Sequence, residues 1–149
     1  MILPDVNVLV YAHRQDAEQH DLYRAWLEEA LDGAEVCGVS DLILSGCLRV
    51  LTHPKVFLPP TPLPQAVAFV EQLRAHPRMT IVSPGRRHWE IFRELCGKAA
   101  ARGNLVSDAW HAAVAIEHGC EWITTDRDYA RFPGLRWHHP LEGPTQKTS

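Results

Sequence analysis

The chain has 149 residues, of which 46% are hydrophobic and 22% charged, and its formal net charge is -3 at pH 7. These values indicate one folded domain with a sizeable core, and they exclude both a disordered chain and a polyanion-binding protein that acts through bulk positive charge. Four irregularly spaced cysteines argue against a zinc knuckle or a disulfide framework, and the apolar runs are too short to cross a bilayer, so we expect a cytoplasmic protein with no membrane segment.

Strand-like and helix-like patterns alternate through the first half of the chain. The apolar run that opens the chain ends at Pro4, so Asp5 is the first residue past a predicted strand. Either Asp5 or Asn7 then caps a short buried helix, and either Ser40 or Asp41 caps a later one. The expected elements are a strand over residues 1–3, helices over 6–13 and 20–31, a strand over 35–39 and a helix over 42–52.

The second half begins with Leu58–Pro64, whose four prolines predict a stiff, extended connector of polyproline II character. Asn104 is expected to cap the last helix and Gly119 to end it. The expected elements are helices over residues 65–76, 87–102 and 106–118, with strands over 79–82, 120–125 and 135–137. The alternation predicts an α/β fold with a mainly parallel central sheet flanked by helices, formed by a single domain over 1–140, and a flexible tail over 141–149.

Acidic residues follow the first and last long strands and open the last helix. Asp5 leaves the first strand, Asp126 and Asp128 leave a late one, and Asp108 falls in the first turn of the predicted helix. If the strands are neighbours, these carboxylates converge at the carboxyl edge of the sheet. Like charges held close need a proton or a cation, and an all-oxygen site selects Mg²⁺ or Mn²⁺. Such a site suits phosphodiester cleavage by an activated water.

Each acid also has a purely structural interpretation. Asp5 can serve only as a helix cap, Asp108 as a surface acid favoured by the helix dipole, and Asp126 as part of an Asx turn. The combination of these acids favours a site over three separate caps. Asn7 and Thr125 are short polar residues beside the acids and are expected to support them.

Three segments resemble one known family. They are MILPDVNVLVYA at the start, LRVLTHPKVF in the middle and NLVSDAWHAAVAIEHGCEWITTDRDYARFPGLRW near the end. Together they are similar to PIN-domain proteins, and specifically to VapC toxins of VapBC toxin–antitoxin pairs. The resemblance implies a PIN-like fold and a Mg²⁺-dependent endoribonuclease that cuts structured RNA such as tRNA or rRNA, forms a homodimer and is silenced by a VapB-type antitoxin. It also implies that Asp5, Asp108 and Asp126 are the metal and catalytic positions, with Asp128 close by.

One position departs from the family pattern. The family usually carries a Glu in the helix after the second strand, where this chain has Gly46 within the segment SGCLRV. Asp41, five residues earlier, can replace this acid only if its helix begins later than predicted. The departure leaves open whether one or two metal ions bind, and it keeps a catalytically weak RNA-binding or partner-binding protein as the main alternative.

Basic and aromatic residues give a weaker indication of an RNA path. Arg86, Arg87 and Arg127 are candidates for phosphate contacts, and Trp110 or Tyr129 for a stacking face. The nine histidines lack a zinc-type spacing such as HExxH. An aspartyl-phosphate phosphatase is disfavoured, because Asn7 stands where that chemistry needs its second acid.

Overall fold

The computed structural model describes residues 1–143, in which five short strands form one parallel sheet of order β3-β2-β1-β4-β5. The strands are β1 (Ile2–Pro4), β2 (Cys37–Val39), β3 (Met79–Ile81), β4 (Glu121–Ile123) and β5 (Trp137–His138). The helices are α1 (Val6–His13), α2 (His20–Asp32), α3 (Asp41–Leu51), α4 (Leu63–Ala75), α5 (His88–Lys98), α6 (Asn104–Glu117) and the 3-10 helix η1 (Arg127–Arg131). The predicted α/β fold with a parallel sheet is confirmed.

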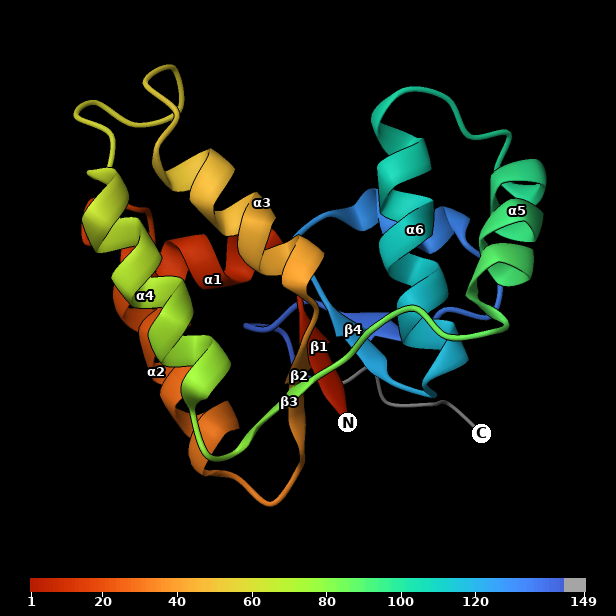
Figure 1. Ribbon diagram of the computed structural model, residues 1–149, viewed down its shortest axis with the longest axis horizontal. Coiled ribbons are helices and arrows are strands. Elements are labelled where there is room, and N and C mark those ends of the chain that lie inside the picture. Colours follow the sequence, from red (N-terminus) through yellow and green to blue (C-terminus); the bar gives the residue numbers. More distant parts are fainter. Residues whose placement is uncertain (144–149) are drawn as a thin grey trace.

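The order of the strands creates a switch point beside the central strand. The chain builds outward from β1 through β2 to β3, and β4 then returns to the opposite side of β1. Figure 1 shows the strands lying between a group formed by α1 to α4 and a pair formed by α5 and α6. Pro4 lies opposite Ile123 in the register of β1 and β4, so both strands end at the same edge. In open α/β sheets, ligands bind at the carboxyl ends of strands at such a switch point.

The first strand and helix are joined rigidly by Asp5. All three residues of β1 are buried, and Asp5 then takes an extended conformation with φ -74° and ψ 164°. Its carboxylate accepts a hydrogen bond from the backbone N–H of Val6 at 2.7 Å, so Asp5 rather than Asn7 caps α1. Val8, Leu9 and Val10 are fully buried behind this cap, which fixes where Asp5 lies.

Helix α6 packs closely because its buried face is made of small residues, chiefly Ala109, Ala112, Ala113 and Ala115. It begins at Asn104, so the prediction that Asn104 caps a helix starting at residue 106 is wrong. The chain turns at Gly103, which has φ 61°, a conformation open to glycine, and this starts the helix earlier. Asp108 consequently lies in the second turn of α6 instead of the first.

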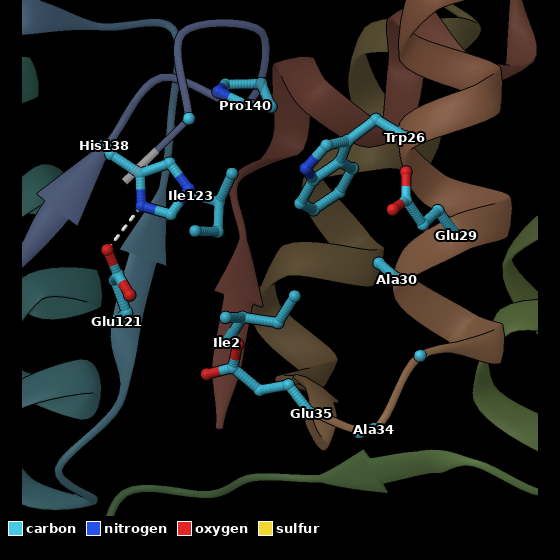
Figure 2. A pocket seen from close by; sticks show the side chains of 12 residues that line it. Ile2, Trp26, Glu29, Ala30, Ala34, Glu35, Glu121, Ile123, His138 and Pro140 are labelled. Carbon is cyan, nitrogen blue, oxygen red and sulfur yellow. Dashed lines mark hydrogen bonds and ion pairs between the residues drawn. The ribbon is translucent and has the colours of Figure 1, made fainter. Parts of the chain in front are cut away.

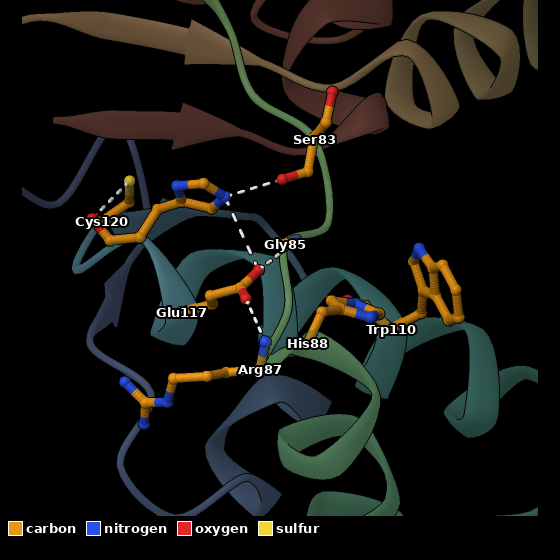
Figure 3. A network of polar contacts seen from close by, with 8 residues as sticks. Ser83, Gly85, Arg87, His88, Trp110, Glu117 and Cys120 are labelled. Atoms are coloured by element: carbon orange, nitrogen blue, oxygen red, sulfur yellow. Dashed lines mark hydrogen bonds and ion pairs between the residues drawn. The ribbon is translucent and has the colours of Figure 1, made fainter.

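The connection from β3 to α5 is attached to the far end of α6 by Glu117. This carboxylate accepts hydrogen bonds from the backbone N–H groups of Gly85 at 2.6 Å and Arg87 at 2.9 Å, as Figure 3 shows. The neighbouring His118 contacts the Ser83 carbonyl at 2.8 Å through Nε2. Helix α5 is shorter than predicted and ends at Lys98, because the chain turns at Ala100, where φ is 48°.

The proline-rich connector is shorter than expected. Residues 54–59 form turns and bends and α4 starts at Leu63, so the extended connector is confined to residues 60–62.

An open cavity of about 410 Å³ lies between α2 and strands β1, β4 and β5. Figure 2 shows Trp26 and Ile123 in its wall.

The end of the described chain remains attached to the domain. Leu141 packs against the core, and Glu142 pairs with Arg127 at 2.6 Å. The rest of the predicted tail, residues 144–149, lies outside the described residues. Within residues 1–143, no helix has the length and apolar character needed to cross a membrane.

Candidate active site

Asp5 and Asp126 are brought together by a residue that lies between them. Asp5 is 9% exposed at the end of β1, and its N–H donates to the Ile123 carbonyl of β4 at 2.8 Å. The fully buried Thr124 donates its hydroxyl to Asp5 Oδ2 at 2.7 Å, and the same hydroxyl oxygen accepts the Asp126 N–H at 3.0 Å. Thr124 therefore fixes the carboxylate of Asp5, which follows β1, and the backbone of Asp126, which follows β4.

Asp126 begins the 3-10 helix that follows β4. Its Oδ1 accepts the Asp128 N–H at 2.9 Å, as an N-cap carboxylate does. Asp128 itself is exposed, and its carboxylate lies 3.8 Å from the Arg131 guanidinium. Asp126 is thus the inner acid of this pair, and Asp128 lies on its solvent side.

Asp108 approaches the same edge from helix α6. Its Oδ1 accepts a hydrogen bond from the Tyr129 hydroxyl at 3.2 Å. Tyr129 is 1% exposed, so the prediction that it offers RNA a stacking face is wrong. The other candidate, Trp110, packs edge-on against Phe92 with ring centroids 5.3 Å apart.

The pKa values of the acids show that they act on one another. Burial, followed by the negative charge of Asp126, raises the pKa of Asp108 to about 6, and Asp5 and Asp128 add to the effect. Burial also raises the pKa of Asp5, although hydrogen bonds from Thr124 and Val6 oppose this rise. Carboxylates that are costly to ionise together are a setting in which a bound cation is strongly favoured.

The donor set fits a hard divalent cation, because Asp5, Asp108 and Asp126 offer only oxygen atoms. Over residues 1–143, no three acidic, histidine or cysteine side chains already converge as tightly as the ligands of a bound metal ion. The three aspartates lie at one edge of the sheet without forming a preassembled ligand set within residues 1–143.

Gly46 has a packing role in this structure. A Cβ atom added there would lie 2.7 Å from Val6 Cγ2, so α3 approaches α1 through this glycine. A glutamate at position 46 would displace Val6, the residue that follows Asp5. Asp41 does not replace the missing acid, because it opens α3 and forms a two-point ion pair with Arg74 at 2.9 and 3.4 Å.

The remaining predicted residues are not joined to the acids. Among the described residues, the side chains of Asn7 and Thr125 make no hydrogen bond to the aspartates; Thr124, which the sequence did not single out, does. The backbone N–H of Arg87, not its guanidinium, donates to Glu117, which lies nine residues beyond Asp108 on α6 and about 14 Å along the helix. Arg127 is exposed and paired with Glu142. A role for Arg86, Arg87 and Arg127 in RNA binding stays a prediction.

The chain is similar to known proteins over most of its length. The PIN domain family model matches residues 2–135. Ribonuclease VapC43 of Mycobacterium tuberculosis is 45% identical over 145 residues, covering 97% of this chain and 99% of the relative. Ribonuclease VapC25 of the same organism is 41% identical over 140 residues, covering 94% of this chain and 99% of the relative.

Solved structures share the fold. VapBC2 from Rickettsia felis, bound to a DNA fragment from its promoter, has a TM-score of 0.71 at 19% identity and covers 93% of this chain and 98% of its own. VapBC-1 from nontypeable Haemophilus influenzae has a TM-score of 0.68 at 15% identity and covers 95% of this chain and 99% of its own. The family match and the mycobacterial relatives together place this chain in the PIN-domain family, among the VapC ribonucleases.

Proposed function

We propose that this protein is a metal-dependent endoribonuclease toxin that cuts structured RNA, such as tRNA or rRNA, in the cytoplasm. The observation that carries the proposal is the placement of Asp5, Asp108 and Asp126 at one edge of the sheet, linked through Thr124 and Tyr129, in a VapC-type chain. In the proposed site these three carboxylates hold Mg²⁺ or Mn²⁺, with Asp128 beside them. The cation would lower the pKa of a bound water and offset charge on the phosphate during cleavage.

The chain's own residues prepare this site in three ways. Thr124 holds Asp5 against the start of the β4–η1 loop, Tyr129 holds one oxygen of Asp108, and the turn at Asp128 holds one oxygen of Asp126. Because the raised pKa of Asp108 lies near 6, this carboxylate is largely ionised at neutral pH and available as a ligand.

The proposal is tested with purified protein and total RNA. We expect cleavage with Mg²⁺ or Mn²⁺, none in EDTA or with Ca²⁺ alone, and none with Asp5→Asn in any metal. Mapping the new RNA ends identifies the substrate. Undiminished cutting by the wild type in EDTA would exclude the metal site.

A catalytically weak RNA-binding or partner-binding protein is the second candidate, and the observation that favours it is Gly46. This glycine packs against Val6, so the position where the family usually carries a Glu holds no acid. RNA that binds to the wild type but stays intact in the presence of Mg²⁺ would support this alternative.

We further propose that a VapB-type antitoxin silences the protein. The structural neighbours from Rickettsia felis and nontypeable Haemophilus influenzae are named VapBC2 and VapBC-1, and the first is bound to a DNA fragment from its promoter. An Arg or Lys of the partner that reaches the three aspartates would replace the cation. Co-expression with the adjacent antitoxin gene should relieve toxicity and give a complex without Mg²⁺ binding. A complex that still cuts RNA at the rate of the free protein would rule out occlusion of the site.

A further inference from the structure

The three aspartates belong to two separate layers of the molecule. Asp5 and Asp126 both follow strands of the sheet and share the Thr124 hydroxyl. Asp108 belongs to helix α6, and Thr124 does not reach it. The side-chain hydrogen bond that joins Asp108 to the sheet side of the site comes from Tyr129, three residues after Asp126 in η1.

Tyr129 is held firmly enough to fix the direction of its hydroxyl group. The side chain is 1% exposed, and its ring lies against Trp122 and Phe132 with centroid separations of 5.4 and 5.8 Å. An aromatic ring packed on two sides in a dense core keeps a single rotamer. The Tyr129 hydroxyl is the donor in this contact, because an ionised carboxylate oxygen can only accept a hydrogen bond.

Asp5 and Asp126 do not depend on the Tyr129 hydroxyl, because other groups donate hydrogen bonds to their carboxylates. Both oxygens of Asp5 accept hydrogen bonds, from Val6 and from Thr124, and Oδ1 of Asp126 accepts the Asp128 N–H. Asp108 receives one hydrogen bond within residues 1–143, the one from Tyr129 to Oδ1. Without it, the Asp108 side chain would be free to rotate.

We propose that Tyr129 is the positioning residue for Asp108: its hydroxyl fixes Oδ1 and so orients the carboxylate that, with Asp5 and Asp126, would hold the cation. This inference rests on the proposed metal-dependent function. Tyr129 contacts neither the cation nor RNA and acts through Asp108. A ligand that is already oriented loses less rotational freedom when it binds the ion, so the hydroxyl should increase affinity for the metal.

The test is Tyr129→Phe, which removes the hydroxyl and keeps the buried ring. Calorimetric titration with Mg²⁺ should show affinity about 10-fold weaker than that of the wild type, the expected effect of one charge-assisted hydrogen bond. RNA cleavage should need correspondingly more Mg²⁺, while the rate at saturating Mg²⁺ stays close to that of the wild type. A merely structural role would lower the maximal rate and leave the half-saturating Mg²⁺ concentration unchanged.

Tyr23→Phe is the matched control, because Tyr23 is also buried, at 5% exposure, but packs near Tyr11 and His139 instead of the aspartates. It should leave Mg²⁺ affinity unchanged. All titrations are made at a temperature at which circular dichroism shows each variant to be folded, so that a loss of stability in Tyr129→Phe does not mimic weaker binding.

The outcomes separate the inference from the function on which it rests. Equal Mg²⁺ affinity in the wild type and Tyr129→Phe overturns the positioning role and leaves the metal-dependent function standing. An equal loss in Tyr129→Phe and Tyr23→Phe overturns it as well, because the effect is then general to buried tyrosines. A wild type that neither binds Mg²⁺ nor cuts RNA overturns both proposals.

Discussion

Thr124 shows how a single hydroxyl group can organise two acidic residues. It donates to Asp5 and accepts from the backbone of Asp126, so it satisfies one polar group on each of two neighbouring segments. Since Thr124 is fully buried, water cannot replace it at either partner.

Replacing Thr124 with valine should therefore destabilise the protein by about 1–3 kcal/mol, because the buried Asp5 carboxylate loses one of its two donors and the Asp126 N–H loses its acceptor. Urea denaturation measures the change, with Thr125→Val as the matched control. Thr125 is partly exposed and its side chain makes no hydrogen bond to the aspartates, so its substitution should change stability by less than about 0.5 kcal/mol. Equal effects of the two substitutions would contradict the assigned role.

Asp108 shows that bringing the acids together lowers the free energy of unfolding at neutral pH. Its folded-state pKa of about 6 lies above the ordinary value of 3.8, so the folded protein binds more protons than the unfolded chain between these values. The free energy of unfolding therefore falls as pH rises through this window, and the ionised carboxylate lowers stability at neutral pH.

We expect Asp108→Asn to raise the melting temperature of the metal-free protein at neutral pH by about 3 °C, or about 1 kcal/mol after allowance for solvent screening. The gain should shrink as pH falls below the folded-state pKa, because the wild-type carboxyl group then becomes neutral. Thermal melts with and without Mg²⁺ check this. The ion should stabilise the wild type only, and a variant that is less stable than the wild type at neutral pH would argue against repulsion among the acids.

At the scale of elements, Glu117 joins the β3–α5 connection to α6. Burial alone would raise the pKa of Glu117, but the N–H groups of Gly85 and Arg87 bring it below the ordinary 4.5. A lowered folded-state pKa means that the carboxylate stabilises the fold at pH values above 4.5, and this contribution is lost as pH falls through the folded-state pKa.

Glu117→Gln should lower stability at neutral pH by about 1 kcal/mol, since a neutral amide accepts these two hydrogen bonds less strongly. The difference from the wild type should diminish in acid, where the wild-type carboxylate is itself protonated. Glu71→Gln, on the exposed face of α4, is the control and should have little effect at any pH. A pH-independent loss in Glu117→Gln would point to altered packing instead.

Helices α1 and α3 meet through Gly46. Because an added Cβ would lie 2.7 Å from Val6 Cγ2, Gly46→Glu should lower the melting temperature and leave Mg²⁺ affinity unimproved. The double variant Val6→Ala with Gly46→Glu makes room for the new side chain and should recover part of the lost stability. Tighter Mg²⁺ binding by the single variant in calorimetry would instead show that position 46 is a vacant ligand position.

At the scale of the whole molecule, an apolar patch beside α6 is a candidate surface for the predicted homodimer. Leu42, Trp89 and Val106 are 51%, 63% and 37% exposed, and a groove of about 210 Å³ runs between Leu42, Phe92 and Trp110. Exposed apolar patches of this kind are typical of interaction sites.

We expect the protein to be dimeric in light scattering, and Leu42→Arg to make it monomeric, because a charge would then be buried without a partner. Leu63→Arg, at a leucine that is 58% exposed on α4, should leave the dimer intact. A monomeric wild type, or a Leu42→Arg variant that remains dimeric, would exclude this surface.

The sequence by itself determined the alternation of strands and helices and the position of each acid in the chain. Both follow from local physics. Runs of apolar residues specify buried strands, and Asp5 stands directly after β1, where it caps the next helix. Ser40 likewise caps α3 as one of the two predicted candidates, and Gly119, with φ 65°, ends α6. Such signals involve neighbours in the chain, so composition and spacing reveal them.

The tertiary structure decided which residues meet, because contacts between segments far apart in sequence leave no local pattern. Thr124 and Thr125 are the same residue type side by side, yet only the Thr124 hydroxyl donates to Asp5. The sequence suggested an exposed stacking face for Tyr129, but the packing of η1 buries this side chain beside Asp108. The sequence shows that Gly46 stands where the family usually carries a Glu. Only the approach of α1 to α3 shows that Val6 fills the space a side chain at position 46 would need.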